Sequence, residues 1–158
     1  IYTTPYKTRV NGVVYSSKKI IYEDKEFEGI MLKFIDGKIV EYSAKIGEEY
    51  LKEIINVDSG SDMVGEIAIV EQDSPISKSN LVYHNTLFDE NASCHIALGL
   101  GFLEAAKNVN DKNDIIREEI NMSGIHMDMM IGTDDMKIYG YKNLEEVLIY
   151  ENGKIVLV

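Results

Sequence analysis

The chain has 158 residues, of which 45% are hydrophobic and 27% charged, with 12 Gly and 2 Pro. This composition excludes disordered, collagen-like and low-complexity classes and suits one compact domain. Sixteen Lys and Arg against 27 Asp and Glu give a net charge of −11, which disfavours nucleic acid and anionic membranes as partners. The chain has no apolar run of the roughly 18 residues that span a bilayer, and its first 20 residues lack the apolar stretch of a secretory signal. Its single cysteine, Cys94, cannot form a disulfide within the chain, so we expect a cytoplasmic protein.

Three dipeptides predict tight hairpins, because Asn-Gly and Asp-Gly readily adopt the positive φ angles of a two-residue turn. They are Asn11-Gly12, Asp36-Gly37 and Asn152-Gly153. The β-rich arms are expected at residues 30–35 and 38–42 around the second turn, and at 147–150 and 155–158 around the third.

Two segments have the features of helices. Residues 47–57 place their apolar side chains on one side and their charges on the other, which is typical of an amphipathic covering helix. Residues 89–98 begin with Asp89 and Glu90, which suit the positive end of a helix, and continue with Ala and Leu, which favour the helical state.

The remaining segments are expected to form strands and loops. Residues 66–70 are interpreted as a short buried strand that ends in a turn at 72–75, and residues 126–131 and 137–141 as two further strands. The polar stretch 108–121 carries no signal strong enough to divide a domain. Neighbouring hairpins with few helices predict an α+β fold with a mixed, mainly antiparallel sheet, rather than a doubly wound parallel sheet.

The sharpest chemical feature lies on the strand expected at 126–131. Alternate side chains of a strand share a face, so His126 and Asp128 point one way while Met127 and Met129 point the other. An imidazole and a carboxylate held in this way can both reach a divalent cation, which would offset the cost of burying Asp128. A histidine in a core hydrogen bond beside an edge carboxylate would give the same pattern, so both interpretations stay open at this point.

Four other residues have side chains that could take part in a site. Glu66, among Ile and Val, needs a proton, a cation or strong donors if it faces inward. His95, on the expected helix, is by itself more typical of a partly buried histidine. Cys94 belongs to no Cys-His-Asn arrangement and is interpreted as core filler, and His84 lies outside the expected site because no carboxylate stands at ligand spacing.

The sequence resembles the C-terminal part of the aminopeptidase T, aminopeptidase S and PepS family of metal-dependent aminopeptidases. The resemblance rests on segments that span nearly the whole chain: residues 2–5 (YTTP), 65–68 (GEIA), 73–77 (DSPIS), 85–95 (NTLFDENASCH) and 126–132 (HMDMMIG). It implies that Glu66, His95, His126 and Asp128 bind two divalent metal ions. Zn²⁺, Co²⁺ and Mn²⁺ all suit such mixed nitrogen and oxygen ligands.

The chain departs from the family pattern in two places. A further ligand glutamate of the family would lie upstream of Ile1, and Phe102 stands where the family usually has a tyrosine, so the hydroxyl is lost. The family also has an N-terminal α/β domain that this sequence lacks. We therefore expect residues 1–158 to be a single, C-terminal metal-binding domain of a larger aminopeptidase, inactive in isolation.

The resemblance implies hydrolysis of N-terminal peptide bonds in a peptide substrate, by an intact enzyme that forms a homodimer. It leaves the catalytic residues unassigned, with Glu90 as a weak alternative for the general base. Two other functions remain open: a structural or dimerisation domain without activity of its own, and a metal-dependent amidase.

Overall fold

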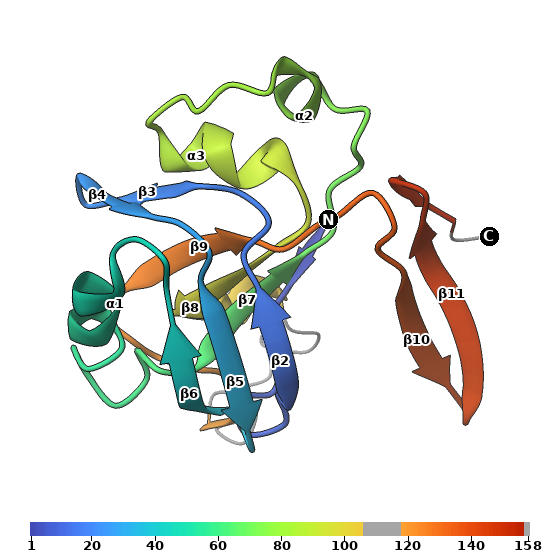
Figure 1. Cartoon of the computed structure of the whole chain (residues 1–158). Helices are drawn as coiled ribbons and strands as arrows, with labels where there is room; N and C mark the ends of the chain where they lie inside the picture. Colours follow the sequence, from blue (N-terminus) through green and yellow to red (C-terminus); the bar gives the residue numbers. More distant parts are fainter. Residues whose placement is uncertain (106–117, 157–158) are drawn as a thin grey trace.

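A four-stranded antiparallel sheet forms the centre of the computed structural model, which describes residues 1–105 and 118–156 (Figure 1). Its strands stand in the order β1, β7, β8 and β9. They comprise β1 (Tyr2–Thr3), β7 (Val64–Ala68), β8 (His95–Gly99) and β9 (His126–Met130).

The hydrophobic core lies between the central sheet and a second, three-stranded sheet of β2 (Gly12–Tyr15), β5 (Met31–Ile35) and β6 (Lys38–Ser43) (Figure 1). Helix α1 (Glu48–Ile54) adds Leu51 and Ile54 to this core. The strands contribute alternate side chains, as expected for sheets with one face buried. These are Leu32 and Phe34 of β5, Val64 of β7, Ile96 and Leu98 of β8, and Met127 and Met129 of β9.

Short elements cover part of the other face of the central sheet. They are the β3–β4 hairpin (Ile20–Tyr22 and Lys25–Phe27) and the helices α2 (Pro75–Ser79), α3 (Thr86–Asp89) and η1 (Glu90–Ala92). Strand β3 and η1 both contact β9. A second short 3₁₀ helix, η2, spans Leu103–Ala105.

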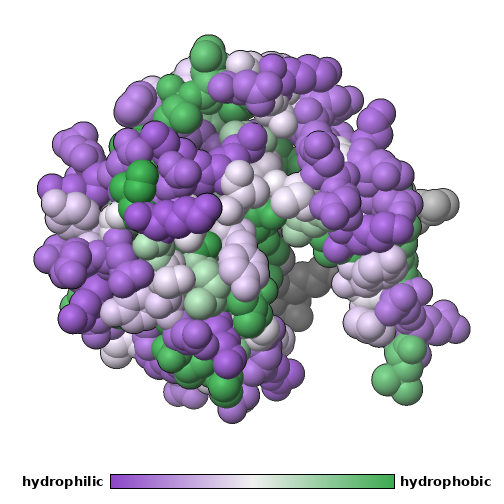
Figure 2. Space-filling view, viewed as in Figure 1, coloured by the Kyte–Doolittle hydropathy of each residue, from purple (hydrophilic) through white to green (hydrophobic). Residues whose placement is uncertain are grey.

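A third sheet projects from the body of the molecule (Figure 1). It consists of β10 (Ile138–Lys142), β11 (Glu145–Glu151) and β12 (Lys154–Ile155). Its base is fixed to the end of β7: the buried Tyr150 hydroxyl donates to the Val70 carbonyl, and the Gln72 N–H donates to the Gly153 carbonyl. Figure 2 shows this sheet as a separate lobe with hydrophobic side chains at its free end.

Most of the elements expected from the sequence are confirmed. Asp36-Gly37 joins β5 to β6 and Asn152-Gly153 joins β11 to β12, with both residues of each turn at positive φ. The covering helix at 47–57, the buried strand at 66–70 and the strands at 126–131 and 137–141 are present, with ends shifted by up to a few residues. Strands and few helices confirm the α+β class with mainly antiparallel sheets.

The expected hairpin at Asn11-Gly12 is wrong. Gly12 instead begins β2, whose antiparallel partner is β5, and the Asn11 side chain accepts a hydrogen bond from the Asp36 N–H. Most of the polar stretch 108–121 lies outside the described residues. No helix in the described part of the chain has both the length and the apolar character required to cross a bilayer.

The helix expected at 89–98 is also wrong beyond Ala92. The chain turns extended after η1, and residues 95–99 form β8, which is paired on both sides, with β7 and with β9. Ala97 and Leu98 favour helices only weakly as single residues, and hydrogen bonding to two neighbouring strands overrides that preference. His95 therefore stands on a central strand.

Candidate metal centre

Strand register gathers ionisable side chains on the face of the central sheet opposite the core. Glu66 of β7 and Asp128 of β9 both stand opposite Ala97 of β8, so the three share one row and one face. His95 and His126 lie on the same face, because their positions alternate with the core-facing residues of β8 and β9. The small Ala97 leaves space between the two carboxylates.

A bulge in β7 directs Glu66 toward this face. The pairing with β8 shifts register between Val64 and Glu66, which leaves Gly65 as the extra residue. A Cβ at Gly65 would lie 2.3 Å from the carbonyl oxygens of both Gly99 and Leu100, so a side chain there would need the backbone to move. Glycine at this position therefore lets two strands approach where the site is formed.

Both histidines have one ring nitrogen beside a backbone carbonyl. His126 Nδ1 lies 2.9 Å from the Leu100 oxygen, and His95 Nδ1 lies 3.3 Å from the Ser93 oxygen. These contacts orient the rings with Nε2 toward the carboxylates. An Nδ1–H bonded to a backbone carbonyl is the usual support of a histidine that binds metal through Nε2.

The Nε2 atoms and the carboxylates converge. His126 Nε2 lies 3.2 Å from Glu66 Oε2 and 3.3 Å from Asp128 Oδ1, and His95 Nε2 lies 3.9 Å from Glu66 Oε1. Glu66, His95 and Asp128 each offer one ligand atom within 4.8 Å of the others. The structure thus brings together the four residues that the sequence analysis selected from three separate segments.

Burial makes this cluster unusual. Asp128 is 4% exposed, His95 4% and Glu66 7%, yet neither carboxylate oxygen of Asp128 has a hydrogen-bond partner among the described residues. A buried carboxylate without partners is strongly disfavoured unless a cation compensates its charge. Two imidazoles and two carboxylates are ligands that Zn²⁺ and similar divalent ions accept, so the residues fit such an ion.

The electrostatics of the cluster also favour positive charge. Burial lowers the pKa of His126, but the adjacent carboxylates of Asp128 and Glu66 and the Leu100 carbonyl outweigh this effect and raise it from 6.5 to about 10. A proton on His126 therefore partly balances the carboxylates when no other cation does so. Protons and divalent ions compete for such nitrogens, so metal binding here would release a proton.

Two residues that the sequence did not assign to the site line a small hollow together with Asp128. Glu90 lies in η1, and its pKa is raised by burial and then by the negative charge of Asp128. Tyr22 lies in β3, and burial followed by the charge of Glu23 raises the pKa of its phenol. Glu90 was a weak candidate from sequence, whereas nothing in the segment around Tyr22 signals this position.

Phe102 packs beside His126, with ring centroids 5.1 Å apart, and its other neighbour is the Tyr2 ring at 5.6 Å. The aromatic surface thus limits the motion of the imidazole without offering a hydroxyl. His84 is exposed and apart from the cluster, and Cys94 is buried, with its sulfur 3.4 Å from the Val70 nitrogen.

Comparison with known proteins shows the family of the chain. The sequence model of the family described as thermophilic metalloprotease (M29) matches residues 1–155. The chain belongs to the M29 family. The buried Glu, His and Asp group could hold a metal ion, which agrees with the description of the family as a metalloprotease.

Relatives in the M29 family and a solved structure agree with this assignment. The chain is 43% identical to aminopeptidase AmpS of Bacillus subtilis and 42% identical to aminopeptidase 2 of Geobacillus stearothermophilus, in each case over 89% of this chain. Wild-type AmpT from Thermus thermophilus superposes with a TM-score of 0.90 and 36% identity over 99% of this chain and 39% of that chain. The chain spans about a third of the length of the two sequence relatives, 35% and 34%.

Proposed function

We propose that residues 1–158 form the C-terminal, metal-binding domain of an aminopeptidase that hydrolyses N-terminal peptide bonds, with an N-terminal α/β domain elsewhere in the intact enzyme. The observation that carries this proposal is the buried carboxylate of Asp128, whose oxygens have no hydrogen bond among the described residues, although His126 Nε2 lies 3.3 Å from Oδ1, while Glu66 and His95 converge on the same space. The related proteins named as aminopeptidases support the reaction class.

Glu66, His95, His126 and Asp128 are proposed to hold two divalent ions, which Zn²⁺, Co²⁺ or Mn²⁺ could supply. When bound, the ions would polarise the scissile carbonyl and lower the pKa of an attacking water toward about 7. Glu66 faces both histidines, one with each carboxylate oxygen, and is the residue best placed to be shared between two ions.

Other residues of the chain would orient and protonate the reacting groups. The Ser93 and Leu100 carbonyls fix both imidazoles. Glu90 lines the hollow beside Asp128 and its raised pKa brings it closer to the range in which a carboxyl both accepts and donates a proton, so we assign it as the general base. The free α-amine of a peptide would bind to a metal ion held by Glu66, His95, His126 and Asp128, which would account for the selection of N-terminal residues.

Zinc titration calorimetry on the chain itself and a peptidase assay on the intact enzyme test this proposal. The family resemblance implies one further glutamate ligand that is not among these residues, so we expect weak zinc binding and little or no turnover by residues 1–158 alone. The intact enzyme should cleave leucine p-nitroanilide only with added metal, and it should not cleave the N-acetyl derivative. Equal cleavage of the N-acetyl derivative would instead favour a metal-dependent amidase, and no zinc binding at any concentration would contradict the metal centre.

A second function, assembly of a homodimer, is favoured by the projecting sheet. Its side chains include exposed Tyr139, Tyr141, Leu144 and Val147, and Leu144 is 99% exposed. Apolar residues grouped on one exposed element mark contact surfaces more often than chance exposure does. Sedimentation velocity at increasing concentration should show a dimer that Leu144→Lys weakens, and a strictly monomeric chain would remove this function.

A further inference from the structure

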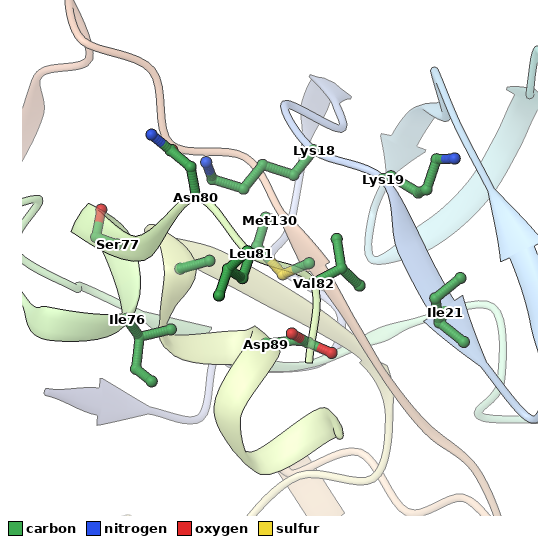
Figure 3. Close-up of a pocket in the computed structure, with 11 residues that line it drawn as sticks. Lys18, Lys19, Ile21, Ile76, Ser77, Asn80, Leu81, Val82, Asp89 and Met130 are labelled. Carbon is green, nitrogen blue, oxygen red and sulfur yellow. The ribbon is translucent and has the colours of Figure 1, made fainter. Parts of the chain in front are cut away.

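Figure 3 shows a pocket of about 200 Å³, which shares lining residues with the small hollow beside Asp128. It is bounded by the start of β3 on one side and by the segment from α2 to η1 on the other. Most of its wall is apolar and comes from Ile21, Ile76, Leu81, Val82, Ala92 and Met130. Such a mixture of apolar walls with a few polar groups is typical of small-ligand sites.

The pocket adjoins the proposed catalytic centre. The small hollow that contains Asp128 and Glu90 shares Ile21, Asp89 and Met130 with it. Met130 follows Asp128 by two residues on β9 and therefore lies on the same face of the sheet. A molecule held at the carboxylates would therefore lie beside the pocket.

The two adjacent lysines at the edge of the pocket differ in their partners. Lys19 Nζ lies 2.7 Å from Glu26 Oε1, and Figure 3 shows its ammonium directed away from the pocket. Lys18 instead extends across the pocket toward Asn80 (Figure 3), and no carboxylate lies within 4.0 Å of its ammonium among the described residues. The pocket's own carboxylate, Asp89, is occupied by the N–H groups of Tyr83 and Asn85.

We propose that this pocket binds the C-terminal residue of a short peptide substrate, with Lys18 paired to its α-carboxylate and its apolar side chain against the pocket wall. The inference rests on the proposed aminopeptidase function, which places the peptide's amine at the carboxylate cluster. A dipeptide or tripeptide reaches about 7–10 Å from there. An acidic side chain would supply the carboxylate but no apolar group for the wall, so a free C-terminus on an apolar residue fits both features.

Methyl NMR on the whole chain without metal tests the pocket independently of activity. With methionine methyls labelled, leucyl-leucine should shift the Met130 signal, while leucyl-leucinamide should bind about three- to tenfold more weakly because it lacks the charge. Lys18→Gln should abolish this difference. The matched variant Lys19→Gln should preserve it, because that ammonium is already paired outside the pocket.

Several results would overturn the inference: no binding of leucyl-leucine, binding that leaves Met130 unmoved, or an unchanged preference in Lys18→Gln. Leucyl-glutamic acid α-amide, whose only carboxylate is in the side chain, should bind as weakly as leucyl-leucinamide. If this compound bound as tightly as leucyl-leucine, recognition of the α-carboxylate by Lys18 would be rejected. Zinc titration separates the two hypotheses, since normal zinc binding with peptide binding independent of Lys18 removes this inference alone.

Discussion

The central sheet and the projecting sheet are both antiparallel, but they distribute polarity in opposite ways. The central sheet buries Glu66, His95 and Asp128, whereas the projecting sheet exposes Tyr141 and Leu144. Each arrangement is costly for the chain alone, because buried charge and exposed apolar surface both raise its free energy. On the functions proposed above, a cation would offset the cost in the central sheet and a second polypeptide surface would offset it in the projecting sheet.

The largest expected effect comes from removing a ligand of the central sheet. His126→Ala and Asp128→Ala should each weaken zinc binding by at least about 100-fold and remove peptidase activity from the intact enzyme, because metal ligands are harder to replace than the groups that support them. Titration calorimetry measures the affinity, and circular dichroism checks the fold. His84→Ala, at the exposed third histidine, is the control, and zinc binding unchanged in both ligand variants would refute the assignment.

Leucine truncation compares the two sheets directly. Leu98→Ala in β8 should lower the free energy of unfolding by about 2–5 kcal/mol, because it leaves a cavity in the core. Leu144→Ala at the tip of the projecting sheet should change it by less than about 0.5 kcal/mol. Urea unfolding at a protein concentration where the chain is monomeric gives both values. A large loss in Leu144→Ala would mean that the projecting sheet stabilises the monomer.

Gly65→Ala tests the bulge that directs Glu66. The added Cβ would overlap two carbonyl oxygens, so we expect a loss of about 1–3 kcal/mol in the free energy of unfolding, together with weaker zinc binding. Gly124→Ala is the matched control, because its Cβ would meet only Asp58 Oδ2, at 3.4 Å. Equal behaviour of the two variants would show that close strand approach at Gly65 is unimportant.

The smallest effect concerns the loop that leads into β9. Hydrogen bonds from the Gly124 and Gly60 N–H groups hold the pKa of the exposed Asp58 below its usual 3.8. A lowered folded-state pKa stabilises the fold fully above the unfolded value, and this contribution is lost as pH falls through the folded pKa. Urea unfolding should therefore give a higher free energy of unfolding for the wild type than for Asp58→Asn at about pH 6, and the two values should converge toward about pH 3. A constant difference would contradict this.

Local patterns allowed part of the fold and site to be predicted. Asp36-Gly37 and the alternation of His126 and Asp128 with Met127 and Met129 depend on neighbouring residues, so the sequence carries them directly. For His95 the sequence predicts a helix, because the residues around it favour the helical state. Its strand depends on pairing with β7 and β9, and residue propensities carry no information about that pairing.

The remaining parts of the site depend on contacts between distant segments. Tyr22 and Glu90 reach the hollow beside Asp128 through the packing of β3 and η1 on the sheet. Strand pairing alone brings Glu66 near His126, 60 residues later in the sequence. The family resemblance implies a ligand role for all four residues, whereas spacing alone indicates only His126 and Asp128.

Ala97 controls the space between the two carboxylates of the cluster, although it is not itself a candidate ligand. It is fully buried and flanked by Glu66 and Asp128, so its methyl group limits the space between the two carboxylates. A bulkier residue such as valine would occupy this space, and it should prevent metal binding although every proposed ligand atom is still present. Substitutions at this position should therefore select cations by the space between the two carboxylates and not by the type of ligand atom.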